Sequence, residues 1–202
     1  MPRTKLQYEL IRNERKDLIL TAALFIFSTK GYNSASMDEI SKTVGCSHGL
    51  LFHYYSSKKD LYISLINEVA MPLIKKSFEG INFNQSGKGI MRDVCNAFFK
   101  ALKSNNDQFS WAINLLLNID DTVGNKSNSV SVLKKHHQSV VASISAIIEQ
   151  GKAEGDFNKE KDTYQSVIAF MALIKGLSYI RMQLGYKKFI YPDVNIIMGL
   201  FY

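Results

Sequence analysis

Hydrophobic positions along this chain recur at spacings of three and four residues, with polar positions between them. In residues 6–30 the repeating apolar set is Leu18, Ile19, Ala22, Ala23, Ile26 and Phe27. This period is typical of amphipathic α-helices, and no stretch of useful length alternates as a strand does. The pattern therefore predicts an all-α protein.

Local signals place the boundaries of the first helices. Gly31 is expected to end the helix over residues 6–30, because glycine is common just past a helix C-terminus. The stretch Ser36-Met-Asp-Glu39 has the form of a capping box and opens a short helix to about residue 44. After the turn Gly45-Cys46-Ser47, Ser47 is expected to cap a helix over residues 48–54.

A second capping box, Ser57-Lys-Lys-Asp60, opens a long helix in which Pro72 is expected to produce a kink or an end. Further helices are expected at about 87–104, 107–120, 129–152 and 161–185, with a short one near 193–201. We thus expect about nine helices. They form a three-helix head (residues 1–57) and a larger helical body (58–202), in which residues 58–80 connect the two.

The seven residues HGLLFHY (48–54) are too few to hold a stable helix alone. Capped at both ends, they make sense as a helix held on a scaffold with one face free. Leu51 and Tyr55 are expected to be buried, leaving His48, Gly49, His53 and Tyr54 outward. Two short helices joined by such a turn suggest a helix-turn-helix. The alternative is an ordinary amphipathic helix in a core.

The stretch ILTAALFIFSTKGYNSASMDEISKTVGCSHGLLFHYYSSKKDL (19–61) resembles the DNA-binding head of the TetR family of bacterial transcriptional regulators. The shared features are paired alanines and a Phe before Lys-Gly-Tyr, a capped helix with Ile, a Val-Gly-x-Ser turn, a glycine with an aromatic-rich helix, and Ser-Lys-x-x-Leu. The resemblance implies a DNA-binding function for the head.

The resemblance also implies roles for single residues. Ser36 and Lys58 stand where family members hold phosphates, Ser47, His48 and Gly49 open the recognition helix, and Phe52, His53 and Tyr54 project into the major groove or onto its phosphates. Three positions depart from the family pattern. Phe52 replaces the usual Tyr and lacks its hydroxyl, Ser41 replaces Ala, and Phe25 is expected to face solvent or to pack on the body.

Residues 129–152 and 161–185 are expected to form a homodimer interface. The second segment is apolar on nearly all faces, so one face can meet the chain's own core and the other a second subunit. Gly176 would permit close approach, and the family resemblance implies the same pairing.

The body is rich in aromatic residues, for which plain core packing is one interpretation. The other is a mostly apolar pocket for a small-molecule effector. We expect part of such a pocket to be lined by Phe99, Trp111, Leu115, Phe170 and Ile174.

Composition adds limits. The formal net charge of +7 suits a polyanionic partner but is not concentrated in one segment. The two cysteines show no disulfide pattern, and Cys46 is expected to be a small apolar turn residue, with a redox role as the alternative. The N-terminus lacks an apolar signal core, and the longest apolar run (167–174) is too short to span a bilayer. A soluble, cytoplasmic protein with no membrane partner is expected.

We expect no enzyme, cofactor or metal site. There are no carboxylates paired on a helix face and no nucleophile with a base, and His48 and His53 are five residues apart, a poor spacing for metal ligands. The favoured function is a ligand-responsive regulator, a repressor that binds a palindromic operator as a dimer and is released by a small, mostly apolar molecule. The alternatives are a constitutive DNA-binding protein, or a small-molecule-binding helical protein with an incidental helix-turn-helix.

Overall fold

The computed structural model describes residues 5–117 and 128–202, with side chains in 5–117 and 137–202. The elements of these residues are all helical. In chain order they are α1 (Lys5–Ser34), α2 (Met37–Val44), α3 (His48–Tyr54), α4 (Lys58–Leu65), the π-helical turn η1 (Ile66–Ala70), α5 (Met71–Ser77), α6 (Gly87–Leu102), α7 (Gln108–Leu117), α8 (Asn128–Ala153), α9 (Thr163–Leu184) and α10 (Val194–Met198). The predicted all-α class is confirmed. The end of the helix expected at 107–120 lies outside the described residues.

The serine caps that the sequence predicts are present. The hydroxyl oxygens of Ser36, Ser47 and Ser57 accept hydrogen bonds from backbone amides three residues later, at 3.1, 3.2 and 3.1 Å. Gly31 has φ 78°, which interrupts the helical backbone of α1 where the sequence predicts an end. In the second capping box, the Asp60 carboxylate reaches back to the amide of Ser56, at 2.9 Å.

Pro72 does not end the connecting helix. The chain forms the π-helical turn η1 directly before it, and α5 then continues to Ser77 with Pro72 in its first turn. A proline in the first turn of a helix removes an amide that has no intrahelical acceptor. The change of hydrogen-bond pattern thus accommodates the residue inside one long connection.

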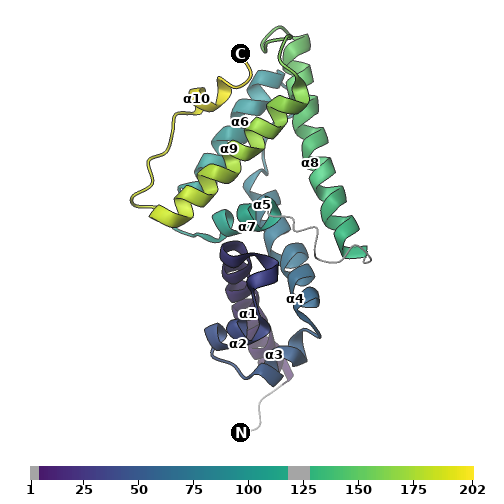
Figure 1. The fold of residues 1–202 in the computed structure, drawn as a ribbon, viewed down its shortest axis with the longest axis vertical. Helices are drawn as coiled ribbons and strands as arrows, with labels where there is room; N and C mark the ends of the chain where they lie inside the picture. Colours follow the sequence, from purple (N-terminus) through teal and green to yellow (C-terminus); the bar gives the residue numbers. More distant parts are fainter. Residues whose placement is uncertain (1–4, 118–127) are drawn as a thin grey trace.

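The elements form a head of α1–α4 and a body that includes α6, α8, α9 and α10, with α7 between them (Figure 1). Helix α7 packs against both α1 and α9, and α6 packs against α8 and α10. One cluster of buried residues fills the head and takes Ala112 and Leu115 from α7, whereas a second fills the body. The body therefore rests on the head through α7.

A buried arginine holds α9 to the turn between α6 and α7. The side chain of Arg181 is fully buried, and its Nε donates to the Leu102 carbonyl at 3.1 Å. Its Nη1 contacts an Asp107 carboxylate oxygen at 2.6 Å, and its Nη2 donates to the Ser104 carbonyl at 3.1 Å. A buried guanidinium needs such partners, because an unpaired buried charge is strongly unfavourable. No sequence pattern indicated this contact.

Helix α9 is, among the described residues, one helix whose length and composition would allow it to cross a membrane, and a third of its most apolar window is buried. The core helix of a soluble protein passes the same test of length and composition. The unburied apolar residues of α9 therefore need a covering partner of some kind.

Candidate nucleic-acid interface

The α2–turn–α3 unit is built from local hydrogen bonds. Gly45 adopts the left-handed conformation (φ 70°) that closes α2, and the amide of Cys46 donates to the Ser41 carbonyl at 2.9 Å. Ser47 then caps α3, and the amide of Tyr55 donates to the Leu51 carbonyl at its other end. Both ends of the seven-residue helix are thus fixed.

Helix α3 has an inner and an outer face. Leu51 and Tyr55 are buried in the head cluster, as predicted. His48, Gly49, Phe52 and His53 are exposed, and the His48 and Phe52 rings lie 4.7 Å apart between centroids. The outer face therefore presents two imidazoles, one phenyl ring and a glycine that leaves the backbone open.

The expectation that Tyr54 points outward is wrong in part. Tyr54 is half-buried and packs against the head cluster. The reason is helical geometry, since residue 54 follows Leu51 by three positions and shares its face. Its ring lies at the edge of the outer face.

The structure also revises the role expected for Lys58. Its ammonium group donates to the carbonyls of Tyr32 and Ala35, at 2.8 and 2.9 Å, and lies 4.5 Å from the centroid of the Tyr32 ring. An ammonium has three donors. A phosphate contact would require Lys58 to leave these partners, so its observed role is to tie α4 to the C-terminal end of α1 and the residue after it.

Charge beside α3 is mixed. Asp38 in α2 pairs with Lys42 at 2.7 Å, and the hydrogen bond from Lys42 lowers the pKa of this carboxyl group below its usual value. Ser36 is exposed at the N-terminus of α2, where the positive end of the helix dipole favours an anion. The interface therefore offers hydroxyls and helix ends rather than a dense basic patch.

Two of the departures from the family pattern, at Ser41 and Phe25, have clear contacts. Ser41 is buried and its hydroxyl donates to the Asp38 carbonyl at 2.8 Å. Phe25 is 44% exposed, and its ring meets Trp111 of α7 edge-on at 5.3 Å between centroids. Of its two expected positions, Phe25 thus keeps some solvent contact while packing on the body.

The five residues expected to line a ligand pocket do not lie together. Trp111 and Leu115 belong to the head cluster, whereas Phe99, Phe170 and Ile174 belong to the body cluster. One face of α7 packs in the head cluster and another in the body cluster. Because α7 is apolar on almost all sides, its sequence pattern does not show which face packs in which cluster. Of the five, only Phe99 lines the hollow of about 560 Å³ beside α6.

The described residues include no group of three or more His, Cys, Asp or Glu side chains placed to hold a metal. Cys46 is half-buried and packs against the head cluster. Cys95 is buried in the body, and burial raises the pKa of its thiol to about 12.

The fold and this site define a class: an all-helical protein with a helix-turn-helix head and a separate helical body. Residues 19–65 match the family model described as bacterial regulatory proteins, tetR family. The head of the chain, which makes up less than half of its length, is therefore similar to bacterial regulatory proteins of the TetR family.

Curated relatives match part of the chain. The transcriptional activator FasR of Mycolicibacterium smegmatis is 31% identical over 90 residues, which cover 45% of this chain and 41% of the relative. The transcriptional repressor AcnR of Corynebacterium jeikeium is 38% identical over 55 residues, 27% of this chain and 29% of that protein. The matched segments thus span less than half the length of these relatives.

Solved structures match over nearly the whole chain at low identity and so establish the fold. A TetR-like regulator from Rhodococcus sp. RHA1 superposes with a TM-score of 0.66 at 16% identity, covering 92% of both chains. The regulator FadR from Bacillus subtilis, solved with stearoyl-CoA, superposes with a TM-score of 0.59 at 18% identity, covering 91% of this chain and 94% of that one.

Proposed function

We propose that this protein is a cytoplasmic transcriptional regulator that binds double-stranded DNA as a homodimer, with α3 in the major groove. The observation that carries the proposal is α3 itself, a seven-residue helix capped at both ends with its polar and aromatic outer face exposed. A recognition helix needs this combination, because a fixed position on the scaffold must accompany a free face.

Contacts to DNA are proposed for two groups of residues. Base edges and adjacent phosphates would be met by the outer face of α3, and phosphates by the hydroxyls that open α2 and α3. The first group is His48, Gly49, Phe52 and His53, with Tyr54 at its edge, and the second is Ser36 and Ser47. Lys58 joins the second group only if it leaves the carbonyls that it binds.

The proposed dimer interface lies on α8 and α9. The exposed face of α9 carries the small and apolar residues Ile168, Ala169, Ala172, Tyr179 and Ile180, together with the half-buried Gly176 and the polar Gln165. A Cβ at Gly176 would meet no atom within 4 Å, so this position is open to a partner helix. The exposed face of α8 also carries small residues, Ala142, Ser143, Ala146 and Ala153, around the exposed Glu149. Small residues on both helices suit close packing across a two-fold axis.

A two-fold dimer would present two α3 helices to successive major grooves. Half-sites would then lie about 34–36 Å apart or at a multiple of this distance, and the operator would be roughly palindromic. This geometry links the dimer face to sequence recognition.

We further propose that the regulator is a repressor released by a small, mostly apolar molecule. Proteins with this fold were solved with stearoyl-CoA, in FadR from Bacillus subtilis, and with choline, in a regulator from Saccharomonospora viridis. A ligand that prefers the dimer with wrongly spaced heads would weaken DNA binding by roughly 5–150-fold, for a coupling of about 1–3 kcal/mol.

Selection of bound sequences from a random duplex pool tests the DNA-binding proposal. We expect enrichment of a palindrome, whose affinity then falls steeply with salt in fluorescence anisotropy. His53→Ala should reduce the preference for the selected sequence, whereas Asn84→Ala, at an exposed position in the α5–α6 loop, should not. Failure to enrich any sequence over the starting pool would refute the proposal.

A further inference from the structure

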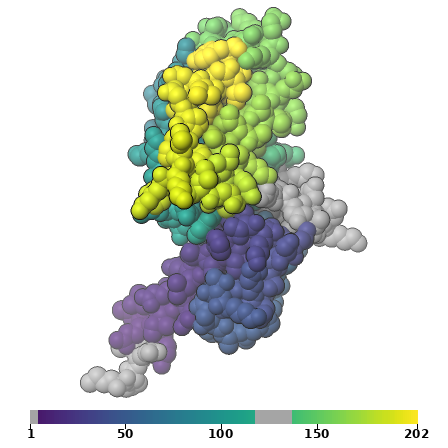
Figure 2. Space-filling view, turned by 60° about the vertical axis from the view of Figure 1, so that its left-hand side comes forward, coloured from purple at the N-terminus to yellow at the C-terminus, as the bar shows by residue number. Residues whose placement is uncertain are grey.

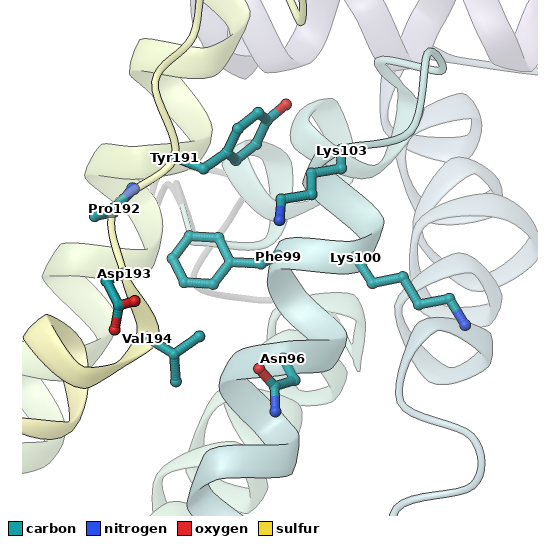
Figure 3. Close-up of a pocket in the computed structure, with 8 residues that line it drawn as sticks. All are labelled: Asn96, Phe99, Lys100, Lys103, Tyr191, Pro192, Asp193 and Val194. Carbon is teal, nitrogen blue, oxygen red and sulfur yellow. The ribbon is translucent and has the colours of Figure 1, made fainter.

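A hollow of about 560 Å³ lies on the outside of the body, between α6 and the C-terminal segment (Figure 3). One wall is the last two turns of α6, and the other is residues 191–194. Figure 2 shows the C-terminal segment, in yellow, running along the surface of the body. The volume of the hollow lies within the range of about 300–1,000 Å³ found for small-molecule sites.

The aromatic part of the wall is held in place. Phe99 is 4% exposed, and Tyr191 meets its ring edge-on, at 6.5 Å between centroids. The Tyr191 hydroxyl donates to the Leu102 carbonyl at 3.0 Å, and the Phe189 ring lies 4.8 Å from the Tyr191 ring. These contacts fix the two rings before any ligand arrives.

A cation stands beside these rings. The Lys103 ammonium lies 5.5 Å from the centroid of the Tyr191 ring and points into the hollow, whereas Lys100 points away from Tyr191 (Figure 3). Asp193 is the carboxylate of the lining, and its Oδ1 already accepts from the amide of Asn195 at 2.7 Å. Two lysines against one engaged carboxylate give the lining a positive balance.

Lysines in the last turn of a helix also offset the negative end of its dipole. That role alone requires neither an aromatic ring beneath Lys103 nor a hollow in front of it. The combination of fixed rings and an adjacent ammonium matches a molecule with a flat apolar body and one negative charge.

We propose that this hollow is a binding site for organic anions with an aromatic or similarly flat apolar body, with Phe99 and Tyr191 holding the body and Lys103 the charge. The proposal assigns a site and a ligand class to the effector of the proposed function, on which its regulatory meaning rests.

Two fluorescent probes separate the charge from the apolar body. 8-Anilinonaphthalene-1-sulfonate carries a sulfonate, and N-phenyl-1-naphthylamine has the same ring systems without it. Both are titrated against the full chain without DNA. Lys103→Met should weaken the sulfonate probe at least fivefold and leave the neutral probe within twofold. Lys159→Met, at an exposed lysine in the α8–α9 connection, should change neither.

A second variant tests the location. Asn96 is exposed on α6 and lines the hollow, so Asn96→Trp fills it without disturbing the buried cluster. Both probes should weaken at least fivefold, with an unchanged melting temperature as evidence of folding. The inference is overturned if the wild-type chain does not bind the sulfonate probe, or if Lys103→Met weakens it by less than fivefold or no more than Lys159→Met does. Because these titrations contain no DNA, this failure is distinct from a failed operator selection, which bears on the proposed function.

Discussion

At the scale of single residues, Lys58 differs from its prediction. The sequence indicates a surface cation that binds phosphate, whereas in the structure the ammonium group stabilises the fold. Lys58 follows the cap Ser57, and its ammonium reaches back to the carbonyls of Tyr32 and Ala35, just past the interruption at Gly31. Carbonyls near a helix end lack intrahelical donors and need other partners. Sequence spacing places Lys58 at the start of α4, but the partners come from a segment more than twenty residues earlier, which no local pattern specifies.

Lys58→Met is therefore expected to destabilise the fold. Hydrogen bonds to charged groups contribute about 1.5–3 kcal/mol each, and the cavity-free replacement by Met keeps most of the packing. We expect the free energy of unfolding in urea to fall by about 1–3 kcal/mol. The neighbouring Lys59→Met should change it by less than about 0.5 kcal/mol. If Lys58→Met instead keeps full stability and only weakens DNA binding, the ammonium serves a phosphate and the structural role is wrong.

At the scale of elements, the caps could be predicted and the packing could not. Ser36, Ser47 and Ser57 were identified from spacing alone, because a capping bond joins residues three apart. The buried positions Leu51 and Tyr55 followed from the helical period, and the same period places Tyr54 partly inward.

Contacts between distant elements left no such signal in the sequence. Trp111 meets Phe25 across the head–body boundary, and Arg181 meets the α6–α7 turn. For this reason the residues expected to line one ligand pocket belong to two different clusters in the structure.

Two matched cap variants separate stability from recognition. Ser47 and Ser86 cap α3 and α6 in the same way, by accepting from amides at 3.2 and 3.1 Å. Ser47→Ala and Ser86→Ala should each lower the free energy of unfolding by about 0.5–2 kcal/mol. Under conditions where both variants are folded, only Ser47→Ala should weaken binding to the selected duplex. Equal losses of DNA affinity would contradict the proposed role of α3.

The turn after α8 packs closely on a glycine of that helix. A Cβ at Gly151 would lie 2.3 Å from a carbon of the Phe157 ring, which is buried in the body. Gly151→Ala should therefore cost about 1–3 kcal/mol, as overpacking does. Gly49→Ala, where a Cβ meets no atom within 4 Å, should not destabilise the chain. Thermal unfolding of the two variants checks this, and equal melting temperatures would show that the ring moves aside freely.

At the scale of the whole molecule, the exposed face of α9 is the feature that one chain alone leaves unexplained. Only a third of the most apolar window of this helix is buried, although the sequence is apolar almost throughout. The sequence predicted this surplus, because a helix that is hydrophobic on most faces must be covered on most faces. The sequence alone does not identify the partner that covers this face.

A charge placed on this face tests the proposed dimer. Ala172→Arg puts a guanidinium at the centre of the exposed face, where burial without a partner is costly. Sedimentation should show a monomer, and affinity for a two-half-site duplex should fall more than tenfold. Asn105→Arg, which adds the same charge in the α6–α7 turn, should leave both unchanged. A dimeric Ala172→Arg protein would place the interface elsewhere.

The guanidinium of Arg181 joins the proposed pairing helix to the base of α7, and α7 in turn lies on α1. If α9 rotates against the α9 of a second subunit, the Arg181 contacts would transmit this rotation to α7. The head would then rotate together with α9 as one rigid part. Removal of the Arg181 contacts should leave each head able to bind DNA. The orientations of the two heads should then no longer be coupled.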